Sequence, residues 1–177
     1  TSTGLNIVVD WGDATTSTIT SHLDVNAKHA YPSAGTYSIS ITGTLPGFKF
    51  AFSGDRQKIL NISNWGVLDI TTNGAFDGCT NLTSSATDAP TISTTDLSST
   101  FANAYIFNGA IGNWDVSGVN NMTAMFATAT AFNNGGSSSI GTWNTSAVTN
   151  MFRMFRGASA FNQDISAWDV SQVSNFV

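Results

Sequence analysis

The chain has 177 residues, of which 41% are hydrophobic and only 10% are charged, with a formal net charge of −5. The hydrophobic fraction, which includes 12 Phe and 5 Trp, is enough for a packed core and excludes a disordered chain. The six basic residues are scattered along the sequence, which argues against binding of duplex nucleic acid, and no apolar run is long enough to cross a membrane.

The polar residues favour turns and strand faces over long helices. Every acidic residue is Asp, and Ser, Thr, Asn and Gly fill most other polar positions. The single cysteine, Cys79, excludes an intrachain disulfide. The sequence starts at Thr1 and contains no basic and apolar leader, so we expect any signal peptide to have been removed or to lie outside it.

Residues 1–61 have the alternation of antiparallel strands. Three segments carry it, and their sequences are LNIVVDWGD, TYSISITG and FKFAFSGD. In the second, Tyr37, Ile39 and Ile41 would share one face, and in the third Phe48, Phe50 and Phe52 would do so. We therefore predict about four or five strands that form a small β-sandwich.

Two alternatives with chemistry arise in this segment. Asp10, Asp13 and Asp24 could supply oxygen ligands for Ca²⁺, although turn formation and strand capping explain them equally simply. His22 and His29 could pair with Asp24 as acid–base groups, but the sequence supplies no nucleophile motif beside them. The prediction is therefore no enzyme and no cofactor, with the Ca²⁺ question open.

A repeat of 25 residues begins near Gly74. Phe76, Phe101 and Phe126 follow one another at this interval, and Phe155 comes 29 residues later. A second apolar series, a small-residue series and the Trp residues keep the same step; these are Leu82, Phe107, Phe132 and Phe161; Cys79, Ala104, Ala129 and Ala158; and Trp114, Trp143 and Trp168. The extra residues fall in 134–139, which we predict to be a flexible loop. Equivalent side chains should stack in register.

Each unit divides into two predicted elements. The apolar spacing in 119–126 and 148–155 predicts short helices, and the segment from Phe161 to Val170 predicts a short strand between turns. One such unit cannot bury its own apolar face, so the pattern predicts a solenoid. Asn108, Asn133 and Asn162 recur after Phe and predict an Asn ladder that satisfies turn backbone groups.

The repeat is irregular at both ends. The units around Trp65 and Ala89 are degenerate, as expected of a capping end. The chain stops at VSNFV, where the next predicted helix would begin, so we expect a truncated array with further repeats of the same chain to follow C-terminally.

The repeat resembles a known bacterial surface-protein repeat. The residues that carry the likeness are WNTSAVTNMFRMFRGASAFNQD and FNQDISAWDVSQVSNF. They are similar to the repeats of BspA-like leucine-rich repeat surface proteins and of mycoplasma and Listeria lipoproteins. The resemblance covers about Asn73–Val177 and implies leucine-rich-repeat-like coils in an extracellular or cell-surface bacterial protein.

The N-terminal segment resembles a second family, the polycystic-kidney-disease-type (PKD) immunoglobulin-like domain. The matching positions are Trp11, Gly12, Asp13, His29, Tyr31, Gly35, Thr36 and Tyr37. The predicted fold class is thus mainly β with short helices: a small PKD-like β-sandwich at 1–61, followed at 62–177 by a leucine-rich-repeat-like solenoid of about four to five repeats. Neither family implies catalytic residues.

These resemblances imply a non-catalytic adhesion or ligand-binding module that binds a host or neighbouring-cell surface protein or glycan through the repeat face. Candidate ligand-binding residues are Gln163 and Ser166, on the expected strand face, and Arg153 and Arg156, which could meet an acidic ligand. The alternatives are a structural spacer or stalk and a carbohydrate- or ice-binding surface. We expect no nucleic-acid partner and no membrane insertion.

Overall fold

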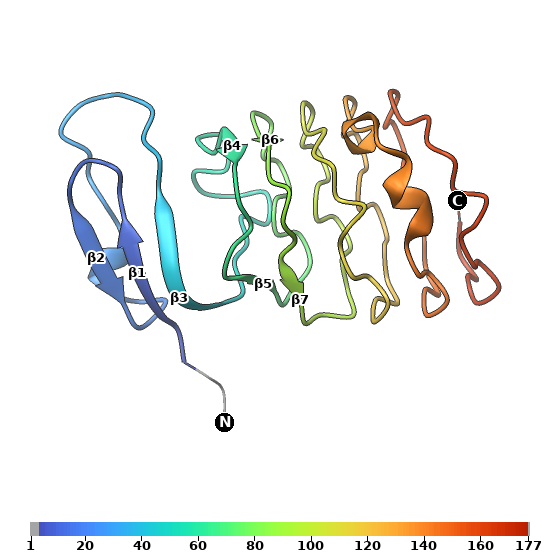
Figure 1. Cartoon of the computed structure of the whole chain (residues 1–177), viewed down its shortest axis with the longest axis horizontal. Coiled ribbons are helices and arrows are strands. Elements are labelled where there is room, and N and C mark those ends of the chain that lie inside the picture. Colours follow the sequence, from blue (N-terminus) through green and yellow to red (C-terminus); the bar gives the residue numbers. More distant parts are fainter. Residues whose placement is uncertain (1–3, 177) are drawn as a thin grey trace.

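The computed structural model describes residues 4–176 and has an elongated shape. Figure 1 shows three long strands at one end, followed by loops that lie side by side in the order of the sequence. The C-terminus lies at the opposite end from these strands. Neighbours along the long axis are therefore also neighbours in the repeat.

The strands at the N-terminal end form an antiparallel layer. They are β1 (Asn6–Asp10), β2 (Thr16–Ile19) and β3 (Ser40–Pro46), and β1 lies between the other two. Alternation in β1 buries Ile7 and Val9 against Ile19. A short 3₁₀ helix, η1 (Val25–Ala27), follows β2.

This layer continues into the repeats. β5 (Leu68–Ile70) pairs with β3, and β7 (Thr91–Ile92) pairs with β5, both in parallel, which gives the order β2-β1-β3-β5-β7. β4 (Asn61–Ile62) and β6 (Thr83–Ser84) form a separate parallel pair. Leu45 in β3 packs against both hydrophobic clusters and so joins the layer to the repeat core.

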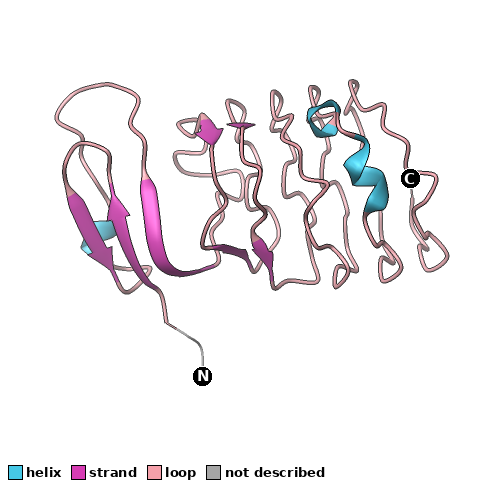
Figure 2. Cartoon of the chain, in the orientation of Figure 1, coloured by secondary structure: helices cyan, strands magenta, loops and turns pink. Residues whose placement is uncertain are grey.

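The predicted PKD-like β-sandwich is wrong. β2, β1 and β3 form one layer that runs on into β5 and β7. The segment FKFAFSGD, predicted as a strand, forms turns (Figure 2). Its N–H groups at Phe50 and Ala51 donate to the carbonyls of Ala75 and Gly74, so its backbone bonds to the first repeat unit and not to a sheet.

The predicted leucine-rich-repeat-like solenoid with short helices is also wrong. After β7, the described residues contain no strand longer than a single bridge, and the only helices are the 3₁₀ helices η2 (Asn134–Gly136) and η3 (Ser138–Thr142). The two segments predicted as helices, 119–126 and 148–155, are runs of turns, and the predicted strand between Phe161 and Val170 is also turns (Figure 2).

Backbone hydrogen bonds between units explain why these helices do not form. Alternate N–H groups leave the unit: Met122 donates to Asn150, Ala124 to Phe152 and Phe126 to Met154. The N–H groups in between donate to the carbonyl three residues back, as Met125 does to Met122. An α-helix would need every one of these N–H groups for its own carbonyls, so stacking of units replaces the helix.

The predicted stacking of equivalent rings is confirmed. Phe101 stacks on Phe76 and on Phe126 with ring centroids 5.5 and 5.8 Å apart, and Phe126 stacks on Phe155 at 5.5 Å. A second column joins Phe107, Phe132 and Phe161 at about the same step. Each unit also pairs its two rings, at 3.9 Å for Phe126 and Phe132, so the two columns form one aromatic core.

The loop predicted to be flexible is ordered by one buried side chain. Asn134 is fully buried; its Oδ1 accepts the N–H of Ile111 at 2.8 Å and its Nδ2 donates to the Ser137 carbonyl at 2.6 Å. The amide thus fixes the inserted residues as the 3₁₀ helices η2 and η3 and ties them to the preceding unit.

The turns place residues in the left-handed region at fixed positions. One position is occupied by Gly74, Ser99, Ala124 and Arg153, and another by Gly78, Asn103, Thr128 and Gly157, all with φ between 53° and 76°. Non-glycine residues adopt this conformation at a cost of about 1–2 kcal/mol.

Ala124→Gly should therefore stabilise the protein by about 0.5–1 kcal/mol, because relief of the left-handed strain exceeds the entropy that glycine loses on folding. Ala127→Gly is the matched control, since Ala127 lies three residues away without a positive φ, and it should destabilise by a similar amount. Urea unfolding of both variants checks this; the same sign for both would contradict it.

Candidate functional site

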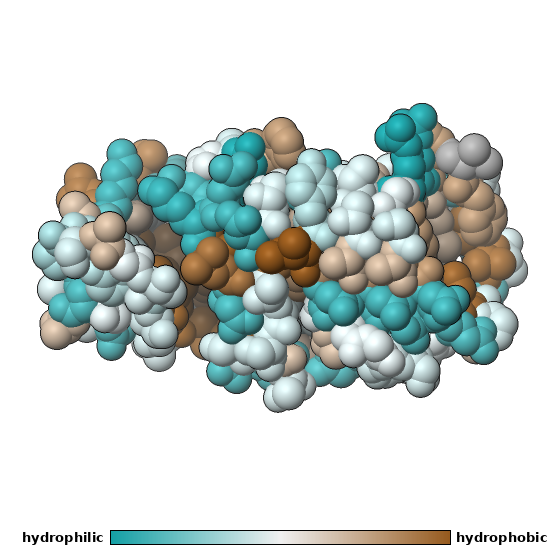
Figure 3. Space-filling model, turned by 90° about the horizontal axis from the view of Figure 1, so that it is seen from above, coloured by the Kyte–Doolittle hydropathy of each residue, from teal (hydrophilic) through white to brown (hydrophobic). Residues whose placement is uncertain are grey.

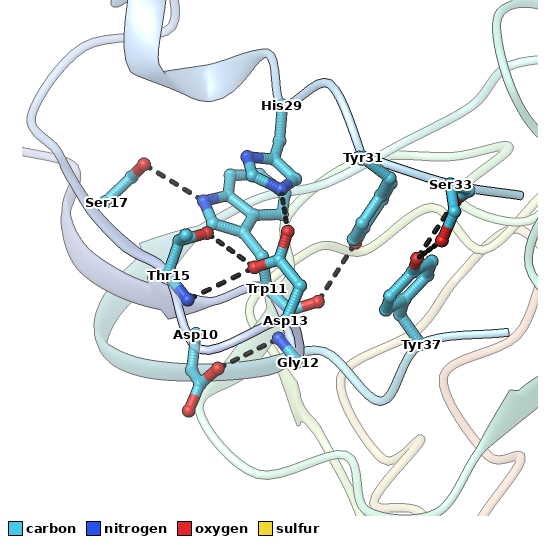
Figure 4. Close-up of polar contacts among 10 residues, drawn as sticks. All are labelled: Asp10, Trp11, Gly12, Asp13, Thr15, Ser17, His29, Tyr31, Ser33 and Tyr37. Carbon is cyan, nitrogen blue, oxygen red and sulfur yellow. Dashed lines mark hydrogen bonds and ion pairs between the residues drawn. The ribbon is translucent and has the colours of Figure 1, made fainter. Parts of the chain in front are cut away.

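The most polar cluster of the N-terminal layer surrounds His29 (Figure 4). His29 stacks on Trp11 with ring centroids 4.8 Å apart, and its Nε2 lies 2.8 Å from Oδ2 of Asp13. Asp13 also accepts hydrogen bonds from the N–H and the hydroxyl of Thr15. The Thr15 hydroxyl, followed by His29, lowers the pKa of the Asp13 carboxyl below its usual value.

The carboxylates proposed as Ca²⁺ ligands serve separate turns. Asp10 accepts the N–H of Gly12, and Asp24 accepts the N–H groups of Asn26 and Thr20. Within residues 4–176, no three His, Cys, Asp or Glu side chains are grouped so that they could hold a metal ion. His29 pairs with Asp13, whereas the sequence had suggested Asp24 as the partner.

The thiol of Cys79 lies inside the repeat core. It is fully buried at the position where later units carry Ala, and burial raises its pKa to about 12. Such a thiol stays protonated at neutral pH and is a poor nucleophile, as the sequence predicts for a structural position.

One edge of the repeats is a row of Asx turns. Asp115 and Asp169 accept the N–H of the serine two residues on, and Asn144 does the same in the unit between them. The same contact forms at Asp164 and Ser166. Hydrogen bonds from these serines lower the pKa of Asp115, Asp164 and Asp169.

These carboxylates predict acid destabilisation. A carboxyl whose pKa is lower in the folded than in the unfolded state stabilises the fold above the unfolded value of 3.8, and this contribution is lost as pH falls through the folded pKa. The melting temperature should therefore fall between about pH 5 and pH 2.

The repeat itself supplies the control for this prediction. Asp115→Asn copies Asn144, which makes the same turn without a charge, so the variant should keep the fold and show a shallower fall with acid. Melting curves across this pH range test it; an unchanged pH profile in the variant would exclude a contribution from Asp115.

A second surface carries the predicted Asn ladder, which is confirmed. Oδ1 of Asn108 accepts the N–H of Asn133 at 2.7 Å, and Oδ1 of Asn133 accepts the N–H of Asn162 at 2.9 Å. Gln163 donates from Nε2 to Oδ1 and to the carbonyl of Asn133. Among the candidate ligand-binding residues, Gln163 is thus already engaged in this ladder, and Ser166 lies in an Asx turn.

The other two candidates, Arg153 and Arg156, lie together on a third surface. Both are exposed, and the Arg153 guanidinium lies 4.5 Å from the centroid of the Phe152 ring. Hydrophilic side chains stand out near this C-terminal end of the molecule (Figure 3). Both arginines also border a largely apolar hollow of about 520 Å³, whose other lining includes Met154, Phe155 and Trp168.

We call this third surface the arginine face. It contains Phe152, Arg153 and Arg156, a floor of small side chains from the two preceding units, and Arg56 at the far end; the floor residues are Ser98, Ser99, Thr123, Ala124 and Ala127. The structure does not bring Gln163 or Ser166 into this group. Sequence reasoning missed Arg56, because it precedes the recognisable repeat and reaches the face only through the fold.

Comparison with known proteins gives one family. A family model described as "Mycoplasma protein of unknown function, DUF285" matches residues 47–139 and 134–177. No curated protein and no solved structure matches the chain significantly. In the part of the chain that the structure describes, no helix is long and apolar enough to cross a membrane.

The family match agrees with the sequence resemblance at the level of a bacterial surface-type repeat. The two matched ranges overlap in the segment of the inserted loop, so the family pattern restarts where the repeat spacing changes from 25 to 29 residues. They cover well over half of the sequence, and the protein belongs to the DUF285 family.

Proposed function

We propose that this chain is a non-catalytic adhesion module of a bacterial surface protein of the BspA-like type. It binds a protein or glycan of a host or neighbouring cell through a surface of its repeats. In this proposal the protein acts outside the cell or on its surface.

One observation supports this most directly. Equivalent residues of successive units stand at a fixed step, which is 5.5–5.8 Å between the stacked Phe rings, and backbone hydrogen bonds hold the units in register. Surface side chains are therefore arranged in rows whose geometry is set before a ligand arrives. Such preorganisation reduces the entropy that is lost on binding.

The alternative of a spacer is supported by the same regular stack, because rigid repeats can simply separate other domains. A carbohydrate- or ice-binding surface is a narrower version of the binding proposal. The repeats lack regular Thr-x-Thr rows, so ice is the less favoured ligand.

The test is a glycan and protein array probed with the purified chain, followed by a bulky substitution on each surface of the repeats. Thr123→Trp changes the arginine face, Thr130→Trp a position beside the Asn ladder, and Ala147→Trp the edge of Asx turns. An adhesion module gives a specific hit that one of the three variants abolishes while the other two retain it. No specific hit, or a hit that survives all three, contradicts binding through the repeats and favours the spacer.

A further inference from the structure

Three of the six basic residues gather on the arginine face. Arg56 lies against Gly78, since a Cβ built there would come within 2.7 Å of its Nε. Arg156 precedes Gly157, which occupies the same repeat position as Gly78 three units later. The stacked rings of the four units set the separation at three steps of 5.5–5.8 Å.

Aromatic rings hold the cations at both ends of this face. The Arg56 guanidinium lies 4.5 Å from the centroid of the Phe52 ring, and Arg153 makes the same contact with Phe152. The ion pairs among residues 4–176 are His29–Asp13 and Lys58–Asp55, so no described carboxylate pairs with these arginines. A guanidinium stacked on a ring keeps its N–H edge available for an anion.

The acidic groups near the face are engaged within the protein. Asp77 lies below Arg56, is partly buried and accepts a hydrogen bond from Asn103. Asp96 accepts the N–H of Ser98. At the other end, Arg153 and Arg156 occupy the repeat positions of Ala124 and Ala127, so the positive charge is concentrated there.

The floor between the two ends does not suit a peptide. The N–H groups of Ser99 and Ala124 donate to the next unit, so an added strand could not use them. The floor side chains are small, and large anchors in pockets, on which protein–protein recognition depends, have no counterpart among them. Flat contact and charge are what these residues offer.

We infer that the arginine face binds a linear acidic polysaccharide, whose carboxylate or sulfate groups meet Arg153 and Arg156 at one end and Arg56 at the other. Both anions match the planar fork of a guanidinium. The intervening sugars lie over the small residues of the floor. This inference rests on the proposed binding function and names the class of ligand.

The experiment measures binding of the whole chain to heparin, polygalacturonate, neutral dextran and poly-glutamate at low and high salt. We expect binding to heparin or polygalacturonate that weakens with added salt, and little binding to dextran or poly-glutamate. Preference between the first two probes identifies sulfate or carboxylate as the group recognised.

Matched variants locate the site. Arg156→Gln should weaken binding about fivefold, and the double variant Arg153→Gln/Arg156→Gln should weaken it further. Lys28→Gln removes the same charge beside η1, away from the face, and should leave affinity unchanged. Circular dichroism spectra confirm that each variant is folded.

The outcomes separate this inference from the function on which it rests. Equal losses for Arg156→Gln and Lys28→Gln, or stronger binding of poly-glutamate than of either polysaccharide, overturn the inference. A specific neutral glycan or protein on the array, unaffected by loss of the arginines, also overturns it but leaves the adhesion function intact. Absence of any ligand removes both.

Discussion

Phe126→Ala should destabilise the protein by about 3–5 kcal/mol. The Phe126 ring is fully buried and stacks on Phe101, Phe155 and Phe132 with centroids between 3.9 and 5.8 Å away. Its removal leaves a cavity whose walls are held by hydrogen bonds between units, so the site cannot readily collapse. Urea unfolding monitored by tryptophan fluorescence gives the free energy of unfolding.

An exposed phenylalanine is the control for this loss. Phe176 has 54% of its surface exposed, so Phe176→Ala removes the same atoms from a site that is already solvated. It should change the free energy of unfolding by less than about 1 kcal/mol. If the two substitutions cost the same, the stacked rings are not the main source of stability.

Asn134→Ala should cost about 2–4 kcal/mol, although it replaces a polar side chain in an inserted loop. The substitution leaves the Ile111 N–H and the Ser137 carbonyl without their buried partner. Each such group keeps its desolvation cost and loses its hydrogen bond. Unfolding measurements and amide exchange at Ile111 test the two parts of this prediction.

Asn144→Ala provides the matched comparison. Asn144 also caps a backbone N–H, that of Ser146, but it does so at an exposed turn where water can replace it. The expected cost is below about 1 kcal/mol, with no effect on exchange at Ile111. A larger loss at Asn144 than at Asn134 would show that burial does not set the cost.

Side-chain periodicity predicted the core but not the backbone. The 25-residue spacing of Phe76, Phe101 and Phe126 identified which rings stack, because equivalent positions in a repeat meet equivalent neighbours. The same spacing suggested helices at 119–126, and these are absent. Apolar residues at helical intervals also fit a run of turns that carries left-handed residues such as Ala124 and Thr128.

The N-terminal layer shows a similar limit. Alternation identified β1 correctly, and it also predicted a strand at FKFAFSGD, where none forms. The N–H groups of Phe50 and Ala51 find acceptors in the first repeat unit, a partner 24 or so residues away that local alternation does not reveal. The sandwich prediction failed for this reason.

The sequence by itself determined the repeat, the residues of its core, the Asn ladder and the absence of a reactive environment at Cys79, because each depends on residue type at a regular interval. Only the tertiary structure decided the path of the backbone, the burial of Asn134 and the gathering of Arg56 with Arg153 and Arg156. Those depend on which distant hydrogen-bond acceptors and surfaces lie within reach, and stacking of units, not local propensity, sets that.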